Sequence, residues 1–590
     1  MIYERYEDLP TRSYDFVIVG GGNAGVVLAN RLSENAEVSV LLLEAGGAYE
    51  NAHMAHIPFL CTMLGDTEVD WGYKLTPQAA LDGRVVPYPR GFVLGGSSAI
   101  NYMACTRGSA EDYDRFAKVT GDDGWSWKSL LPYFHKSEKY TVVDSRDATE
   151  YDATHHSTAG LHHIGLPMAQ RDLDQKVIRS LSDEFPFNSS INSGKPIGFG
   201  ATIFDELCAN LIYPFSCAKD GSPVSVKGGA RNSAASSYLA QAYLARPNLH
   251  VLVKAHVTRV LQTGTSDAGP VFRGVEFVQK GDVSVKHTVT AAKEVVLSAG
   301  AVGTPAILLH SGIGDTKVLE GLGIKSTLNL PDVGQNLSEH TLSAISWEVN
   351  STNTFEAFTR DPAGREAAEK EWRESKTGPL STPPCTQIGF LRLPESLSIL
   401  ATTADPAAGP NTPHMELLFL NGFLGPPPPT GNYLTVAFAC VTPTSLGSVT
   451  LASNDPLAAP LIDPKLLGTE IDRVTMREAF KAARKFVTGP GFKDYIIREL
   501  SAEVPDTDEG IDAYLRATTA VVFHPTGTAK MSAKDAKDGV VNPDLLVKGA
   551  VGLRVVDASV FPFIPSAHTM LPVYALAERA SDLIKAEHKI

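Results

Sequence analysis

A short apolar run followed by three spaced glycines constrains the fold of this chain more than any other feature. Phe16 to Val19 are apolar without alternation, which is typical of a parallel strand covered on both faces. Gly20, Gly22 and Gly25 then follow the G-x-G-x-x-G spacing. In such a turn the first glycine allows a tight bend, the second lets the backbone approach a pyrophosphate, and the third lets helix and strand pack closely. The stretch therefore predicts a dinucleotide-binding βαβ unit of Rossmann type.

The residues after the glycines complete this unit. Asn23 and Ala24 open a helix that is expected to end near Ser33, and the N–H groups at its start would face the phosphates. A second apolar strand, Val38 to Leu43, leads into Glu44 and Ala45. An acidic residue about 20 positions after the first glycine accepts hydrogen bonds from ribose hydroxyls in this motif. At this point NAD and FAD are equally suitable ligands.

Length and composition indicate a multidomain globular enzyme. A chain of 590 residues is too long for one simple core, so two or more closely joined domains are expected. Hydrophobic residues make up 43% and charged residues 20%, and no run of 18 apolar residues occurs, so no membrane span is expected. The net charge of −14 disfavours a nucleic-acid partner, since phosphate binding needs concentrated Lys and Arg. We expect a monomer.

The cysteines and a group of histidines do not match known metal-site patterns. The six cysteines are dispersed without a C-x-x-C pair, so neither a zinc site nor a redox dithiol is indicated, and Cys208 and Cys217 are the closest candidates for a disulfide. The histidines lie in a loop-rich stretch, and their spacing does not match a helical H-E-x-x-H site. We therefore expect no metal and solvated loop histidines at His155, His156, His162 and His163.

The chain start and three N-x-S/T triplets bear on localisation. Met1 to Tyr6 lack the basic start and apolar core of a signal peptide. The triplets at Asn188, Asn336 and Asn350 are glycosylation acceptors in a secreted chain. We therefore expect a secreted, extracellular protein whose sequence is that of the mature form.

Different parts of the chain show different patterns of apolar residues, which indicate two domains. Between about Asn336 and Gly489 alternating segments such as His414 to Leu420 and Tyr433 to Val441 predict an antiparallel sheet. The last hundred residues return to α/β character, with Leu553 to Asp557 as a buried strand and Val573 to Ala586 as a helix. The predicted fold class is α/β, α+β overall, in which a Rossmann-like dinucleotide-binding domain (1–160, 226–335 and 490–590), whose ligand the resemblance described below implies to be FAD, joins a substrate-binding domain built on the antiparallel sheet (161–225 and 336–489).

Further segments complete the predicted cofactor domain. Gly95, Gly96, Ser97 and Ser98 are small residues that allow either close approach to a flat ligand or a tight turn without a ligand. The strand from Lys293 ends in Gly300 and leads into another helix. The pattern also predicts helices over Ser233 to Leu244 and Glu470 to Val487.

Two histidines near the C-terminus are candidate catalytic residues. His524 lies between Phe523 and Pro525 in a loop after apolar residues, and His568 precedes the closing helix. Both positions are expected near the carboxyl ends of strands, where open α/β sheets bind ligands. A structural role in the core is the alternative interpretation of each.

The chain resembles the glucose-methanol-choline oxidoreductases nearly from end to end, and most of all the fungal aryl-alcohol oxidases among them. Four ordered motifs carry the resemblance: the unit from Gly20 to Glu44, the segment Gly95 to Asn101, the segment Gly300 to Gly314, and the pair His524 and His568. The resemblance implies FAD, with the ADP portion on the opening unit and the isoalloxazine ring beneath the two histidines.

The resemblance assigns roles to particular positions. It implies that His524 is the base that removes the hydroxyl proton and that His568 binds the same oxygen, while a hydride passes from carbon to flavin N5. Some relatives hold flavin covalently through a histidine that aligns with Ile100, so FAD is expected to be non-covalent here. The expected FAD contacts are Gly20, Gly22, Asn23, Ala24, Gly25, Glu44, Ala45, Arg90, Gly95, Gly96, Ser97, Ser98, Asn101, Val257, Ala299, Gly300, Asp557, Ala558, Thr569 and Met570.

The expected activity is oxidation of primary alcohols, aryl or allylic, to aldehydes, with O2 or a quinone reoxidising the flavin. Tyr102 and Phe523 match aromatics that line the access path in aryl-alcohol oxidases, and Phe423 adds a third aromatic residue. At the remaining position of that gate Leu424 replaces an aromatic, which would widen the entrance. The alternatives are a pyranose-type sugar dehydrogenase using quinones, a flavin-containing lyase like the hydroxynitrile lyases, and a flavin-binding protein without turnover.

Overall fold

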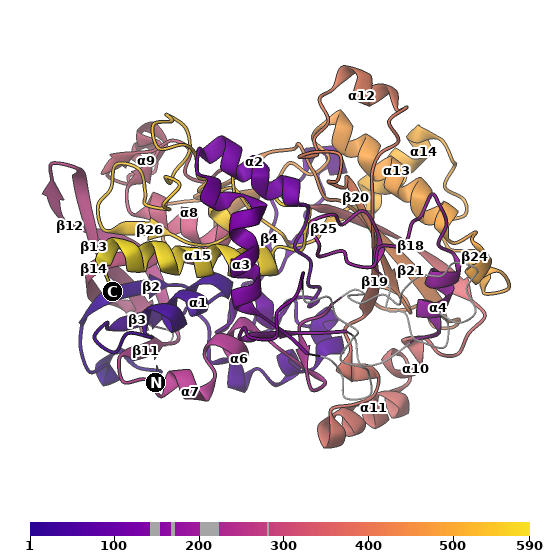
Figure 1. Ribbon diagram of the computed structural model, residues 1–590, viewed down its shortest axis with the longest axis horizontal. Coiled ribbons are helices and arrows are strands. Elements are labelled where there is room, and N and C mark those ends of the chain that lie inside the picture. The colour runs from indigo at the N-terminus through magenta and orange to yellow at the C-terminus, as the bar shows by residue number, and fades with distance from the viewer. Residues whose placement is uncertain (142–153, 167–170, 201–222, 280–281) are drawn as a thin grey trace.

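The computed structural model describes residues 1–141, 154–166, 171–200, 223–279 and 282–590. Two large sheets organise these residues, one of eight strands and one of seven. In Figure 1 the first sheet lies on the side of the chain termini, and the second lies on the opposite side beneath α13 (Glu470–Phe486) and α14 (Asp508–Thr518). The predicted mixed α/β class is confirmed.

The first sheet is built on the predicted nucleotide unit. Its strand order is β1-β11-β3-β2-β14-β13-β12, and β26 also pairs with β14. β2 (Ser13–Val19) lies between β3 (Val40–Leu43) and β14 (Asp282–Leu297) and pairs in parallel with both. β11 (Leu249–Leu252) pairs with β3, and β26 (Leu553–Val555) pairs with β14, again in parallel. The central strands thus bring residues 13–19 and 553–555 into one sheet.

The remaining strands of this sheet extend its edges. β12 (Ala255–Ser266) and β13 (Gly269–Gln279) pair antiparallel, and β13 pairs antiparallel with β14. The three strands form the arm that projects at the left of Figure 1. At the other edge β1 (Ile2–Tyr3) pairs with β11. The sheet is therefore parallel at its centre and antiparallel along one side.

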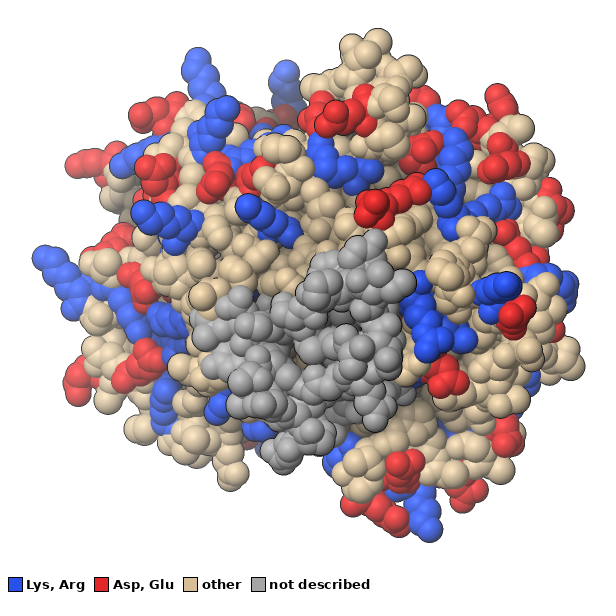
Figure 2. All heavy atoms as spheres, turned by 45° about the vertical axis from the view of Figure 1, so that its right-hand side comes forward, with Lys and Arg blue, Asp and Glu red and all other residues tan. Residues whose placement is uncertain are grey.

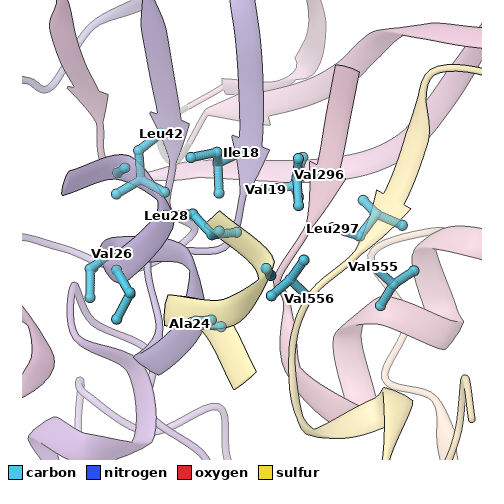
Figure 3. Packing of buried hydrophobic residues seen from close by; sticks show 14 of the residues in the cluster. Ile18, Val19, Ala24, Val26, Leu28, Leu42, Val296, Leu297, Val555 and Val556 are labelled. Carbon is cyan, nitrogen blue, oxygen red and sulfur yellow. The ribbon is translucent and has the colours of Figure 1, made fainter. Parts of the chain in front are cut away.

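Side chains from both faces of β2 are buried, which explains its unbroken apolar run. Ile18 and Val19 lie beside Val296 of β14 and above Leu28 of α1 (Asn23–Leu32) in Figure 3. α1 packs against α15 (Met570–His588), which crosses the same layer in Figure 1. Burial of such side chains stabilises the folded state by roughly 25 cal/mol per Å² of apolar surface removed from water. The opening strand and the closing helix therefore share one core.

The second sheet is antiparallel, as the alternating segments predict. Its order is β24-β18-β21-β20-β19-β8, and β25 also pairs with β18. α13 packs on β21 and β20. The strands are β8 (Gly198–Gly200), β18 (Thr341–Val349), β19 (Cys385–Leu391), β20 (Met415–Leu420), β21 (Tyr433–Cys440), β24 (Ile496–Glu499) and β25 (Ala520–Val521).

Two segment boundaries differ from the sequence-based expectation. β24 and β25 follow residue 490 but pair with β18 of the second sheet, so the domain boundary expected at 490 does not coincide with the end of that sheet. The helix predicted over Ser233 to Leu244 is divided into α6 (Ala234–Tyr238) and α7 (Gln241–Leu244). The break lies at Leu239 and Ala240, whose backbone dihedrals are outside the helical region, with ψ of 29° and 153°.

The prediction of solvated histidines is wrong for two of the four residues. His156 is buried, and its Nδ1 lies 2.5 Å from Oε1 of Glu138. His162 is buried between the side chains of Ser225 and Ser237. Both rings are therefore hydrogen-bonded parts of the core. The candidate disulfide pair Cys208 and Cys217 lies outside the described residues.

Charged side chains are mixed on the surface that Figure 2 shows. On the face in Figure 2 basic and acidic side chains are interspersed, without the broad basic area that a nucleic-acid footprint needs. Within the described ranges no helix is long and apolar enough to cross a bilayer.

Candidate active site

A cavity of about 300 Å³ opens at the carboxyl ends of β2, β3 and β14. Ligands of open α/β sheets bind at this edge. Most of the residues that the sequence predicts for the cofactor line it: Gly20, Gly22, Asn23, Ala24, Glu44, Ala45, Arg90, Gly96, Ser97, Val257, Ala299, Gly300, Asp557, Ala558 and Thr569. The cavity therefore joins segments that are far apart in the chain.

Three helix N-termini meet at the cavity. α1 starts after Gly22, α8 (Gly300–His310) starts after Ala299, and α15 starts after Thr569. None of these three preceding residues caps its helix with a side-chain hydrogen bond, and all three line the cavity. Free N–H groups and the helix dipole favour negative charge at the ends of α1 and α15, whereas the first N–H of α8, that of Gly300, is already bound by the carboxylate of Asp557. The cavity thus suits a ligand with anionic groups.

The glycines leave space for a ligand where the motif requires it. Gly20 has φ of 100°, and a Cβ there would lie 2.4 Å from the carbonyl oxygen of Ser298. A Cβ on Gly25 would lie 1.9 Å from the carbonyl oxygen of Gly20, so Gly25 provides the close helix–strand contact. A Cβ on Gly22 would meet only Cα of Gly96, at 3.9 Å. The free space at Gly22 therefore lies within the cavity, where a pyrophosphate fits.

Two buried polar groups also fit a dinucleotide. Oε2 of Glu44 accepts a hydrogen bond from the N–H of Gly21 at 2.8 Å, and Oε1 accepts one from Gly46 at 2.7 Å. Each oxygen keeps a lone pair that a ribose hydroxyl can use. Burial raises the pKa of Glu44 to about 7. Oδ1 of Asn23 is buried and has no hydrogen-bond partner within the described chain, so it is a further free acceptor.

Asp557 is already engaged within the protein. Its carboxylate accepts hydrogen bonds from the N–H of Gly300 at 3.0 Å and from the hydroxyl of Thr304 at 2.6 Å. The N–H of Ser559 donates to its other oxygen. Asp557 therefore fixes the start of α8 against the segment that follows β26.

The remaining predicted cofactor residues lie behind the cavity wall. The N–H of Gly95 donates to the carbonyl of Gly21, and the hydroxyl of Ser98 donates to the carbonyl of Gly95. Nδ2 of Asn101 lies 3.3 Å from Sδ of Met570, which links this segment to the first turn of α15. Together with Gly25, these residues of the predicted set support the cavity and are not part of its lining.

A bulge places His524. Val522 donates to the carbonyl of His340, and Thr526 exchanges two backbone hydrogen bonds with Ser338, so residues 523–525 lie opposite the single residue Glu339. Extra residues of this kind re-aim a side chain next to a site. Oε1 of Glu339 accepts the N–H of His524 at 2.6 Å. The bulge thus turns the histidine out of the strand pairing and holds its backbone.

Two further contacts secure the bulge. Phe523 has φ of 65°, in the left-handed region that is uncommon for a large side chain. Its carbonyl accepts a hydrogen bond from Arg90 at 2.6 Å. The hydroxyl of Tyr88 donates to the second oxygen of Glu339. Burial raises the pKa of Glu339 to about 7.

The two predicted histidines lie together. The rings of His524 and His568 are 4.9 Å apart between centroids at an interplanar angle of 81°. Nε2 of His568 lies 2.8 Å from Oε1 of Glu416, a buried residue of β20. Nδ1 of His524 lies 3.0 Å from Nδ1 of His340. Burial lowers the pKa of His524 well below its usual range, and His568, His340 and Arg90 lower it further.

The substrate residues predicted from the sequence come from separate regions. Phe523 packs on the second domain core, 6.3 Å from Tyr88 between ring centroids. Phe423 packs on the ring of Tyr433, at 5.5 Å. Leu424 joins another apolar cluster, and Tyr102 is partly exposed. The described contacts do not gather these four side chains into one packed group.

The comparisons with known proteins agree with this geometry. Two models of the GMC oxidoreductase family match residues 14–182 with 192–342, and residues 443–577. The chain is 40% identical to dehydrogenase eriK of Hericium erinaceus, over 100% of this chain and 97% of the relative. It is 37% identical to pyranose dehydrogenase 3 of Leucoagaricus meleagris, over 99% and 94%.

The chain belongs to the GMC oxidoreductase family.

Solved structures of this family share the fold. A formate oxidase of Aspergillus oryzae superposes with a TM-score of 0.87 at 30% identity, covering 98% of this chain and 99% of that one. A fungal aryl-alcohol oxidase superposes with a TM-score of 0.79 at 26% identity, covering 98% and 100%. This GMC protein is therefore an FAD-dependent oxidoreductase with a Rossmann-like domain and a sheet-based second domain.

Several residues at the site of this GMC protein are missing from the sequence-based prediction. Glu339 and His340 directly follow a glycosylation triplet and carry no motif of their own. Glu416 is an acid within the apolar strand Met415–Leu420, and that contrast is a signal that could have identified it. Trp71, Tyr73 and His256 also line the cavity.

One further cluster has the composition of a metal site. Glu294, Glu587 and His588 lie close together and are the only such group within the described ranges. Arg554 occupies its centre, with Nε 2.7 Å from Glu294 and a second hydrogen bond to Glu587. The guanidinium already forms ion pairs with both carboxylates, so the cluster is an ion-pair network.

Proposed function

We propose that this protein oxidises primary alcohols, aryl or allylic, to aldehydes, with His524 as the base. The observation that carries the proposal is a buried histidine of low pKa whose Nε2 has no hydrogen-bond partner among the described residues. His568 lies beside it, supported by Glu416. A neutral imidazole is suited to accept a hydroxyl proton at ordinary pH.

We assign the following roles to residues of this chain in the reaction. FAD, when bound, supplies a hydride acceptor at flavin N5. His524 takes the hydroxyl proton on Nε2, and His568 binds the same oxygen through its free nitrogen. Between them they orient the alcohol for transfer. The N-terminus of α15 would present its positive end to the pyrimidine edge of the flavin.

The proposed FAD contacts are the predicted residues that line the cavity, with Gly95, Ser98, Asn101 and Met570 behind them. Ile100 offers no nucleophile for a covalent link, so the flavin is held non-covalently. We also propose that the protein is secreted and monomeric. Asn350 is exposed in its acceptor triplet, which supports secretion.

Aromatic side chains favour an aryl or allylic substrate. Tyr102, Phe423 and Phe523 are partly exposed. A sugar is the second candidate substrate, because pyranose dehydrogenases are similar to nearly the whole chain. O2 or a quinone would reoxidise the flavin in either case.

Anaerobic mixing separates these functions. The oxidised protein is mixed without O2 with benzyl alcohol, an allylic alcohol, glucose or a cyanohydrin, and the flavin absorbance is followed. We expect bleaching with the aromatic or allylic alcohols. Bleaching with glucose alone would favour the sugar dehydrogenase, and a flavin that stays oxidised with every donor would contradict both and favour a lyase. Steady-state rates with O2 and with benzoquinone then identify the acceptor.

Substitution of the base tests the role of His524. We expect His524→Ala to keep the flavin spectrum and to reduce the flavin about 10²- to 10⁴-fold more slowly, since this is the usual contribution of a general base. The matched control is His53→Ala, at an exposed histidine. If His524→Ala reduces its flavin at the rate of the control, the base lies elsewhere.

A further inference from the structure

A third histidine contacts the proposed base from behind. His340 lies in the segment that leads into β18, and its Nδ1 is 3.0 Å from Nδ1 of His524. The ring centroids are 5.2 Å apart at an interplanar angle of 82°. A hydrogen bond between two imidazole nitrogens needs one N–H and one lone pair. The contact therefore couples the tautomer of His524 to that of His340.

Both rings are neutral at ordinary pH, so one proton is shared by this contact. Burial lowers the pKa of His340 to about 3, and His568 lowers it further. If His340 donates, Nε2 of His524 carries the hydrogen and cannot accept a proton. If His524 donates, its Nε2 has the lone pair that a base requires. The direction of this bond thus decides whether His524 is a base or a donor toward the substrate.

The proposed role of His524 selects the second arrangement. A base needs the lone pair on Nε2 of His524, so Nδ1 of His524 must carry the hydrogen and donate it to His340. Nε2 of His340 is buried and has no hydrogen-bond partner within the described ranges, so no other contact of that ring opposes this arrangement. Nδ1 of His340 is then the acceptor.

The other charged groups described near His524 are engaged elsewhere. Glu339 binds the backbone N–H of His524 and the hydroxyl of Tyr88. Arg90 donates to the carbonyl of Phe523, and Glu416 binds His568. Among the described residues, His340 is the hydrogen-bond partner of the His524 ring.

We propose that His340 is a positioning residue that accepts the Nδ1–H of His524 and so keeps Nε2 of His524 as the basic nitrogen. This inference rests on the proposed function, because it takes His524 as the base. In the step itself the substrate O–H bond breaks and an Nε2–H bond forms on His524, while FAD, when bound, would supply the acceptor for the hydride from carbon. His340 stays neutral throughout and holds the Nδ1–H of the imidazolium.

The neutral partner has a chemical consequence. A buried carboxylate beside Nδ1 would favour the imidazolium and raise the pKa of the base. An imidazole acceptor fixes the tautomer without adding a negative charge. Of the two site histidines, it is His568 that contacts a carboxylate, through Glu416. The base and the oxygen-binding histidine are thus supported by groups of different charge.

Two variants of the holoenzyme test the proposal. His340→Leu removes the acceptor with little change in size, whereas His340→Asn places an amide oxygen close to the original Nδ1. We expect His340→Leu to keep its flavin spectrum and to slow anaerobic flavin reduction about 10- to 100-fold, the usual effect of losing such an outer partner. His340→Asn should recover most of the rate. Equal rates in His340→Leu and wild type, or equal losses in both variants, would overturn the proposal.

A spectroscopic measurement separates a positioning role from a structural one. In protein labelled with ¹⁵N-histidine, long-range ¹H–¹⁵N correlation spectra distinguish the protonated ring nitrogen from the one with a lone pair. The His524 signals are assigned by their loss in His524→Asn. We expect Nδ1–H on His524 in wild type and a shift toward Nε2–H in His340→Leu. An Nε2–H form in wild type would contradict the proposal.

The experiments distinguish failure of the inference from failure of the proposed function. A flavin that stays oxidised with every donor would remove the proposed function itself, and normal flavin reduction in His524→Ala would remove the assignment of the base. Loss of reduction in His524→Ala with an unaffected His340→Leu would remove only the role of His340.

Discussion

At the scale of single residues, the geometry of the site depends on a strained backbone. A large side chain with positive φ, as at Phe523, costs on the order of 1–3 kcal/mol and persists only where the surroundings enforce it. Arg90 and Glu339 provide that enforcement through hydrogen bonds on either side of the peptide that joins Phe523 to His524. The position of the base is therefore set by contacts to its backbone as well as to its ring.

The first residue-scale prediction concerns Glu339. Its pKa is raised to about 7 in the folded protein from an ordinary value of 4.5, so the folded protein binds this proton more tightly than the unfolded chain does. The folded state therefore has its full stabilisation from protonated Glu339 below pH 4.5, and it loses this stabilisation as pH rises through about 7. That loss is on the order of 3 kcal/mol for a fully buried group. Glutamine resembles the protonated carboxyl, so Glu339→Gln should match wild type near pH 5 and have the higher melting temperature near pH 8.

The measurement is a series of thermal melts from pH 5 to pH 8. Glu503→Gln, at an exposed position, is the control and should follow wild type throughout. A constant difference in melting temperature between Glu339→Gln and wild type across this range would show that Glu339 does not titrate in it.

The site residues differ in how far the sequence could identify them. His524 and His568 could be identified because loop-forming neighbours and an ordered set of motifs surround them. Glu339, His340 and Glu416 could not, because they act through a bulge and a strand pairing that join residues 338–342 to residues 520–526. Such pairing depends on tertiary structure, and single residues in a strand have no spacing that indicates it.

At the scale of elements, the turn between β2 and α1 combines two kinds of glycine. Gly25 is needed for packing, since a Cβ there would overlap the carbonyl of Gly20. Gly22 is surrounded by open space on the cavity side. The strand and helix of this unit were predictable because the periodicity of apolar residues and the spacing of glycines are local properties of the sequence. The break between α6 and α7 at Leu239 and Ala240 was not, since neither residue is a glycine or proline that would mark a helix end in the sequence.

The prediction at this scale is that Gly22→Ala folds but loses FAD. The added methyl group would occupy the space that a pyrophosphate needs, while the stability of the apoprotein should change by less than about 1 kcal/mol. The flavin-to-protein absorbance ratio and the melting temperature of the apoprotein are the measurements. Gly264→Ala, where an added Cβ also meets open space but on the β12–β13 hairpin, should retain FAD. Full flavin content in Gly22→Ala would contradict this placement of the phosphates.

At the scale of the whole molecule, the cavity connects segments from nearly the full length of the chain. Its lining residues extend from Val19 to Val573 in the sequence. They include residues 456–460, which follow β21 and precede β24 in the chain. A ligand bound there would contact many elements that unfold together. The two sheets were predictable from the change in periodicity, whereas their junction was not, because β24 and β25 follow residue 490 yet pair in the second sheet.

We therefore expect removal of FAD to lower the melting temperature of the whole protein. At free FAD one hundred times above Kd the stabilisation is about 3 kcal/mol. Acid treatment should release the yellow chromophore into the supernatant, and added FAD should restore the melting temperature. Chromophore that precipitates with the protein would show a covalent link, and equal melting temperatures with and without FAD would show that the cavity is not its site.

The pairing of β26 with β14 also has a consequence for how the protein is made. The central sheet lacks residues 553–555, and the cavity lacks the start of α15, until the ribosome has translated these late segments. At ordinary elongation rates the nascent protein spends roughly 30 to 120 s without a complete cofactor site. Its opening βαβ unit stays exposed for most of that time. The complete cofactor site thus forms only after the segment that contains β26 and the start of α15 has been synthesised.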